Sequence, residues 1–195
     1  MRKLMFISLI IVLVLCQNVI AKDKVILTAT YNKSFFETRS CDMVGLNLEI
    51  FISKNVSLNY SVLLGGDGRN FALHSTGGLV GGIHLLGYAL DAIAEDDGES
   101  SSAFYGVSTI FALMLPEGVN LHLPLSQYVT LVPYIHPLGY DYFGPQETLS
   151  SSLGLKVMYN IDDKLLVIPQ IGVSLFYASE NTTNYNLGVS VGYKF

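Results

Sequence analysis

The sequence carries little charge: only 14% of its 195 residues are charged, while 50% are hydrophobic. Beyond the first 21 residues, however, no hydrophobic run reaches the length of about 20 residues that a membrane-spanning helix needs. A helical membrane protein would look different. In a membrane β-barrel, apolar residues alternate with polar ones and never form a long continuous run, so a barrel accounts for this composition.

Cysteine is also scarce, and one of the two cysteines falls in an N-terminal export signal. The chain opens with two basic residues, continues with an uncharged apolar run over 4–16 and reaches a small residue at Ala21. This pattern predicts a signal peptide over 1–21, because the run is too short for a retained anchor. Cys41 is then the only thiol, which excludes an intramolecular disulfide.

Acidic residues outnumber basic ones in the chain. Without the signal peptide, nine Lys and Arg residues face 16 Asp and Glu residues, which gives a formal net charge of −7. An acidic exported chain is a poor partner for nucleic acid, so we expect none. Residues 22–195 are enough for one domain.

The last eleven residues alternate strictly between large apolar residues and small or polar ones. Their large apolar side chains recur at every second position, and the residues between them are Asn, Gly, Ser, Gly and Lys. This period places the two sets on opposite faces of a β-strand, and the length suits a tilted strand that crosses a bilayer. The apolar set is Tyr185, Leu187, Val189, Val191, Tyr193 and Phe195.

This stretch resembles the closing strand of bacterial outer-membrane β-barrels, whose terminal aromatic residue is read by the assembly machinery. The resemblance implies an all-β, antiparallel, up-and-down membrane barrel in the bacterial outer membrane. It implies as partners outer-membrane lipid, lipopolysaccharide and the barrel assembly machinery, the last through Phe195. We expect a monomer. The alternative fold is a soluble periplasmic β-protein whose Tyr193 and Phe195 face is buried against a second sheet.

Alternation elsewhere predicts the other strands, over 25–35, 44–53, 56–64, 129–136, 152–160 and 165–177. Tight turns at 54–55, 126–127 and 162–163 would lie on the periplasmic side, and longer loops at 37–42, 66–116, 141–148 and 179–184 outside. Prolines 124, 133 and 169 fall inside predicted strands and indicate bulges there, or different strand boundaries.

Residues 66–116 allow two interpretations. In the first, they form a partly helical or irregular insertion between strands three and four, and 117–125 is the fourth of eight strands. In the second, both apolar arms of this region are strands, because 105–115 also alternates, and the barrel has ten strands. We favour eight.

No residue is assigned to catalysis, to a cofactor or to a metal. The predicted register turns a set of polar side chains into the barrel, where unpaired charge is costly, so we expect them to pair and to form a polar plug. This set is Asn47, Glu49, Asn59, His122, Lys156, Gln170 and Lys194.

The expected role is therefore structural or surface-interacting, through the outer loops, and not enzymatic. One alternative is a narrow solute channel. Another is an enzyme that modifies lipid A, since some small barrels that resemble this one do so with a His and a Ser at the outer rim. That enzyme would need His74, beside Ser75, or His84 to meet a hydroxyl and a carboxylate at one rim.

Overall fold

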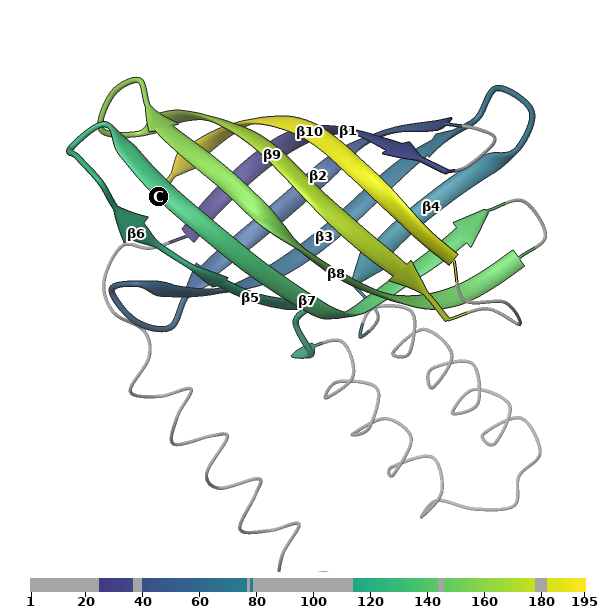
Figure 1. The fold of residues 1–195 in the computed structure, drawn as a ribbon. Coiled ribbons are helices and arrows are strands. Elements are labelled where there is room, and N and C mark those ends of the chain that lie inside the picture. Colours follow the sequence, from purple (N-terminus) through teal and green to yellow (C-terminus); the bar gives the residue numbers. More distant parts are fainter. Residues whose placement is uncertain (1–24, 37–39, 77, 79–113, 144–145, 178–181) are drawn as a thin grey trace, which may run out of the picture.

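The computed structural model describes residues 25–36, 40–76, 78, 114–143, 146–177 and 182–195. These residues form a closed antiparallel β-barrel in which the last strand pairs with the first (Figure 1). We call the end that carries Val25 and Phe195 the inner end and the opposite end the outer end. The predicted signal peptide and the predicted helical or irregular part of the insertion lie outside the described residues.

Ten strands occupy eight positions around the barrel. They are β1 (Val25–Phe35), β2 (Ser40–Phe51), β3 (Val56–Gly66), β4 (Phe71–Thr76), β5 (Gly118–Leu121), β6 (Leu123–Pro124), β7 (Val129–Phe143), β8 (Gln146–Asn160), β9 (Leu165–Phe176) and β10 (Thr182–Lys194). The prediction of eight strands in an up-and-down order is confirmed.

The fourth position is shared by three short strands. β4 pairs with the outer half of β3, from Val62 to Gly66, and β5 pairs with its inner half, from Val56 to Asn59. On the other side β4, β5 and β6 all pair with β7. The insertion therefore interrupts the fourth strand, and the prediction that it lies between strands three and four was wrong. Of the residues predicted to form it, Gly66 ends β3, 67–70 form a turn and 71–76 form β4.

The barrel closes where the last strand pairs with the first. β1 has the predicted bounds, and β10 pairs with it in one register from Ile26 opposite Lys194 to Phe35 opposite Tyr185. The outer connections are shorter than expected, because β2 starts at Ser40 and because β7 and β8 run through most of 141–148. Strand β10 likewise begins at Thr182, within the loop expected over 179–184.

Two prolines in the wall, Pro133 and Pro169, interrupt the pairing of their strands without shifting it. Pro133 and Pro169 keep the register of their strands, and the one register shift of the β7–β8 ladder lies between His136 and Gly139. Pairs are missing beside both prolines, between β7 and the β5–β6 segment and between β8 and β9. Because proline donates no ladder hydrogen bond, the ladder has a gap there and the predicted bulges do not form.

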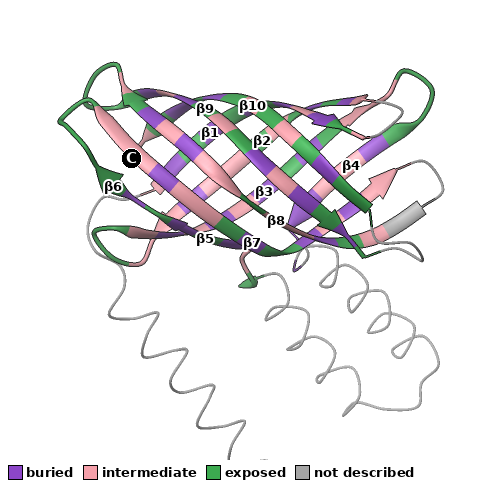
Figure 2. Ribbon diagram, in the orientation of Figure 1, coloured by how far each residue is buried: buried purple, intermediate pink, exposed green. Residues whose placement is uncertain are grey.

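Burial alternates along the strands, as Figure 2 shows. In β1 the buried residues are Ile26, Thr28, Thr30, Asn32 and Ser34, which point into the barrel. The outward set is large, apolar and exposed: Leu187 in β10, for example, is 48% exposed. In the described parts of the chain, no helix has the length and apolar character needed to cross a membrane. The exposed apolar face lies on the strands.

Candidate functional site in the barrel interior

The interior is layered. Near the inner end an apolar cluster is formed by Ile26, Val132, Met158, Leu166 and Ile168, with Phe51 packed against it. Near the outer end a second cluster is formed by Cys41, Met43, Leu63 and Ala72, with Phe36 and Phe143 packed against it. The rings of Phe36, Phe143 and Phe176 contact one another there, with centroids 5.2 to 5.8 Å apart. Polar side chains fill the space between the two clusters.

A buried ion pair lies at the centre of this polar layer. Lys156 Nζ on β8 is 3.0 Å from Glu49 Oε1 on β2, and the two residues are 4% and 0% exposed. The ammonium also donates to the side-chain oxygens of Asn59 and Asn120, at 3.3 and 3.4 Å. The other oxygen of Glu49 accepts from Ser57 at 3.0 Å. Every charge is therefore compensated, which burial requires.

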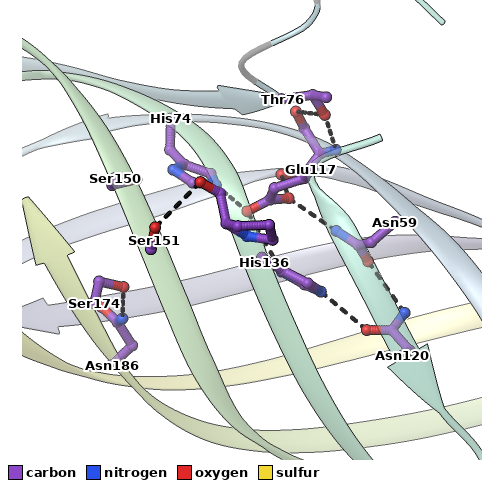
Figure 3. A network of polar contacts seen from close by, with 12 residues as sticks. Asn59, His74, Thr76, Glu117, Asn120, His136, Ser150, Ser151, Ser174 and Asn186 are labelled. Carbon is purple, nitrogen blue, oxygen red and sulfur yellow. Dashed lines mark hydrogen bonds and ion pairs between the residues drawn. The ribbon is translucent and has the colours of Figure 1, made fainter. Parts of the chain in front are cut away.

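Glu117 is the hub of a second set of contacts, seen in Figure 3. Its Oε1 is 2.9 Å from His74 Nε2 and 3.4 Å from His136 Nδ1. Its Oε2 accepts from Asn59 Nδ2 at 2.8 Å and from the Ser61 hydroxyl. Glu117 stands where the chain re-enters the wall ahead of β5, so this carboxylate fixes the returning chain to the interior.

His74 lies between two carboxylates. Its Nδ1 is 2.8 Å from Asp141 Oδ1 on β7, and its Nε2 meets Glu117. An ionised carboxylate can accept a hydrogen bond but cannot donate one. His74 therefore makes both contacts only if both of its ring nitrogens carry a proton. The geometry thus fits an imidazolium that bridges β4 and β7 and offsets the charge of two acidic residues.

Among the described residues, His74 does not form a nucleophile–base pair with a hydroxyl group. The Ser150 hydroxyl donates to Asp141 and the Ser61 hydroxyl to Glu117, so in both cases the carboxylate separates the hydroxyl from His74. A Ser-His-Asp site needs the histidine between the other two. Ser75, the sequence neighbour of His74, points outward because it pairs with outward-facing Val62. His74 and Ser75 therefore do not form the His-Ser pair that the alternative, a lipid A-modifying enzyme, would need at the outer rim.

At Ser57, His122 and Glu49, a histidine does lie between a hydroxyl and a carboxylate, which is the order that such a site requires. Ser57 Oγ is 2.9 Å from His122 Nε2, but Glu49 lies 3.3 Å from the same nitrogen, where a triad places the carboxylate on the other one. Ser57 and Glu49 are both 0% exposed, so no substrate reaches them. These contacts are suited to holding the wall together and not to turnover.

A polar cavity of about 70 Å³ lies in the same layer, and side chains from all eight positions of the wall line it. Asn32 and Asn47 both line it, and in the described structure the side-chain oxygen of each has no hydrogen-bond partner. The space is sufficient for a few water molecules, which buried oxygens of this kind usually bind. No group of three or more His, Cys, Asp or Glu side chains in the described ranges is arranged to hold a metal ion.

Most of the predicted inward set is found in the interior. Glu49, Asn59, His122 and Lys156 meet there as one network, and Gln170 and Asn47 line the cavity. Lys194 differs: it donates to the Asn160 side chain, and no acidic partner contacts it among the described residues. Sequence analysis missed Glu117, Asp141, His74 and His136. His74 and Asp141 fell in predicted loops, where a polar composition masked their alternation with apolar or aromatic neighbours. Glu117 and His136 fell at the ends of the predicted strands 117–125 and 129–136 and were not singled out.

Comparisons with known proteins concern the fold alone. No protein-family model matches the chain, and no curated protein matches it. Among solved structures, the N-terminal β-barrel domain of Pseudomonas aeruginosa OprF is similar with a TM-score of 0.51 and 10% identity, over 89% of this chain and 100% of that one.

Two further neighbours are more distant. Ail, the attachment invasion locus protein of Yersinia pestis, has a TM-score of 0.48 and 7% identity over 89% of this chain and 97% of that one. Neisserial surface protein A has a TM-score of 0.47 and 7% identity over 88% of this chain and 95% of that one. The closed eight-position barrel, its exposed apolar outer face and the similarity to the OprF domain together show that the chain has the fold of small outer-membrane β-barrels.

Proposed function

We propose that the chain is an outer-membrane protein whose lumen does not conduct and whose role is structural or surface-interacting. The observation that carries this proposal is the layering of the lumen. Apolar clusters occupy both ends, and the polar groups between them bind one another. A barrel of eight strands is just wide enough for side chains to fill, which fits this arrangement.

Neither alternative function gains support from the described residues. A solute channel needs a continuous polar path, whereas the rings of Phe36, Phe143 and Phe176 pack together at the outer end of the lumen. A lipid A-modifying enzyme needs its catalytic groups at the rim, whereas His74 faces the interior. With the lumen filled, the surfaces left for interaction are the outer end and the outward wall.

Conductance across a planar bilayer tests whether the lumen is closed. We expect no stable steps from the refolded protein, and none from a Glu49→Ala/Lys156→Ala variant, because the two apolar clusters remain. The heat-dependent gel mobility of each sample confirms that a folded barrel was inserted. Stable, ion-selective steps from the wild-type protein would overturn the proposal.

Location and assembly are tested separately. We propose that residues 1–21 are removed on export and that Phe195 contributes to recognition by the assembly machinery, in a membrane of lipid and lipopolysaccharide. The full-length chain should fractionate with the outer membrane and begin at Lys22, and deletion of Phe195 should lower the amount of heat-modifiable protein. Recovery as a soluble periplasmic protein would contradict this placement.

A further inference from the structure

The polar layer of the lumen contains more acidic groups than basic ones. Its carboxylates are Glu49, Glu117 and Asp141, and Lys156 is the one lysine or arginine that the described residues place between the two apolar clusters. None of these four residues is more than 4% exposed, so bulk water does not screen their charges. The counter-charge for the carboxylates therefore lies inside the barrel.

The hydrogen bonds of the three carboxylates fit the ionised form of each. A protonated carboxyl group donates from one oxygen, whereas every carboxylate oxygen here accepts from a neighbouring donor. The donors are Lys156 and Ser57 for Glu49, His74, Asn59 and Ser61 for Glu117, and His74 and Ser150 for Asp141. The layer therefore contains three negative charges.

Only one of the three histidines in this layer needs a positive charge. His74 donates to a carboxylate from each ring nitrogen and is an imidazolium. His136 donates from Nε2 to Asn120 Oδ1 at 2.9 Å, whereas its Nδ1 lies 3.4 Å from Glu117 Oε1, beyond the usual range of a hydrogen bond. A neutral ring with its proton on Nε2 therefore satisfies His136.

A neutral ring satisfies His122 as well. Its Nε2 lies 2.9 Å from Ser57 Oγ, and Ser57 donates its own proton to Glu49, so one proton on Nε2 completes the contact. Lys156 and His74 are then the two positive charges that face three carboxylates. The described part of the layer keeps one negative charge in excess, which is costly to bury without a counter-ion.

The cavity in this layer presents unpaired acceptors beside that charge. Glu117 and Asp141 line it, together with Asn32 and Asn47. Asn32 is 8% exposed, and in the described structure neither its side-chain oxygen nor that of Asn47 accepts a hydrogen bond. A buried acceptor without a partner is costly. A cation, with the waters that it holds, would satisfy both the oxygens and the excess charge.

The ligand that fits this cavity is a small monovalent cation. Carboxylate and amide oxygens are ligands for hard cations, and one positive charge balances the layer. A divalent ion would exceed that charge. The cavity volume of about 70 Å³ is enough for an ion of the size of a water molecule together with a few waters.

We infer that the cavity binds one alkali cation, Na⁺ or K⁺, through the side-chain oxygens of Asn32 and Asn47, directly or through water. Glu117 and Asp141 supply the negative charge that holds the ion. Because apolar clusters lie at both ends of the layer, the ion binds as the barrel closes and stabilises the folded state. This inference goes beyond the proposed role and does not depend on it.

The dependence of stability on the cation tests the inference. Urea unfolding of the wild-type protein is measured in zwitterionic lipid vesicles, with Na⁺ or K⁺ replaced step by step by N-methylglucammonium at constant ionic strength. Because the folded state binds one ion, the folding equilibrium constant should rise by up to about ten-fold for each ten-fold rise in the alkali cation. A folding constant that responds to neither Na⁺ nor K⁺ would overturn the inference.

Two leucine variants locate the site. Asn32→Leu removes a ligand oxygen, so the same ten-fold rise in cation should raise its folding constant by less than about two-fold. Asn184→Leu is the matched control, because Asn184 is a buried asparagine that does not line the cavity, and it should respond as the wild-type protein does. The same response in both variants would overturn the inference.

A direct measurement on the wild-type protein decides the question even if Asn32→Leu does not fold. Thallium(I) replaces K⁺ and scatters anomalously, so crystals grown with it should show one anomalous peak in the cavity, within coordination distance of Asn32 Oδ1. NMR of ¹⁵N-labelled histidine should show one imidazolium in the folded protein at pH 8. A cavity that holds water alone, or a second imidazolium at His136 or His122, would overturn the inference, because a proton would then supply the missing charge.

Discussion

Neutralising Glu49 should destabilise the barrel more than neutralising Lys156. The ammonium of Lys156 has one carboxylate partner, Glu49, and two amide oxygens, whereas Glu49 also contacts Ser57 and His122. Glu49→Gln therefore leaves a buried charge without a counter-ion, at a cost of about 3–5 kcal/mol. Lys156→Met leaves the carboxylate with its hydroxyl and imidazole partners, and we expect a loss of about 1–3 kcal/mol.

The double variant Glu49→Gln/Lys156→Met separates pairing from packing. Its loss of unfolding free energy should fall short of the sum of the single losses by about 2 kcal/mol, because neither charge is then left alone. Urea unfolding in lipid vesicles, followed by tyrosine fluorescence and gel mobility, measures all three variants.

The exposed pair of Lys33 and Asp42 is the matched control. Its atoms lie 3.4 Å apart, at side-chain exposures of 35% and 50%, so Lys33→Met should cost about 0–1 kcal/mol. Equal losses for the two buried single variants, or strictly additive losses in the double variant, would refute the reasoning from burial.

Three further predictions concern the wall and one turn. Leu187→Arg, on the exposed face of β10, should lower stability in a bilayer by about 2–4 kcal/mol, and a negligible loss would show that this face meets water. Gly45→Ala should cost about 1–3 kcal/mol, or prevent the gel-mobility shift altogether, because a Cβ there would lie 2.0 Å from the Val62 carbonyl oxygen, which belongs to the backbone. Hydrogen bonds from the backbone N–H groups of Leu165 and then Lys164 hold the pKa of Asp162 in the β8–β9 turn below its usual value. Their stabilisation is present above about pH 4 and is lost as the pH falls through the lowered pKa. In Asp162→Asn, the unfolding free energy from urea titrations should therefore fall less steeply below about pH 4 than in the wild-type protein. An unchanged dependence on pH would contradict this.

The sequence was sufficient to predict the strands that alternate without interruption. β1 and β10 show a clear period of two over eleven residues or more, and each matches its predicted span to within three residues. Their pairing follows from closure of an up-and-down barrel, because the first and last strands each have one edge that no strand adjacent in sequence can pair with. The centre of the polar layer, with Glu49 and Lys156, follows from the same parity.

The remainder of the site could not be predicted, for a physical reason. In a barrel with a polar interior, inward residues have the same composition as a loop, so Asp141 and its neighbours indicated a loop where β7 and β8 continue. β4 is only six residues long and adjoins a glycine-rich stretch, which gave its alternation too few repeats to detect. His74, which lies in β4, was therefore assigned to an outer insertion.

The interrupted fourth position also has a consequence for the order of folding. Joining β4 to β5 across about 40 residues instead of a direct connection of about four raises the entropic cost of closure by about 2 kcal/mol. Strands of six and four residues gain too little from pairing to meet that cost alone, and each needs both β3 and β7 beside it. We therefore expect the fourth position to be the last part of the barrel to form, as a slow step that follows the pairing of β1 with β10.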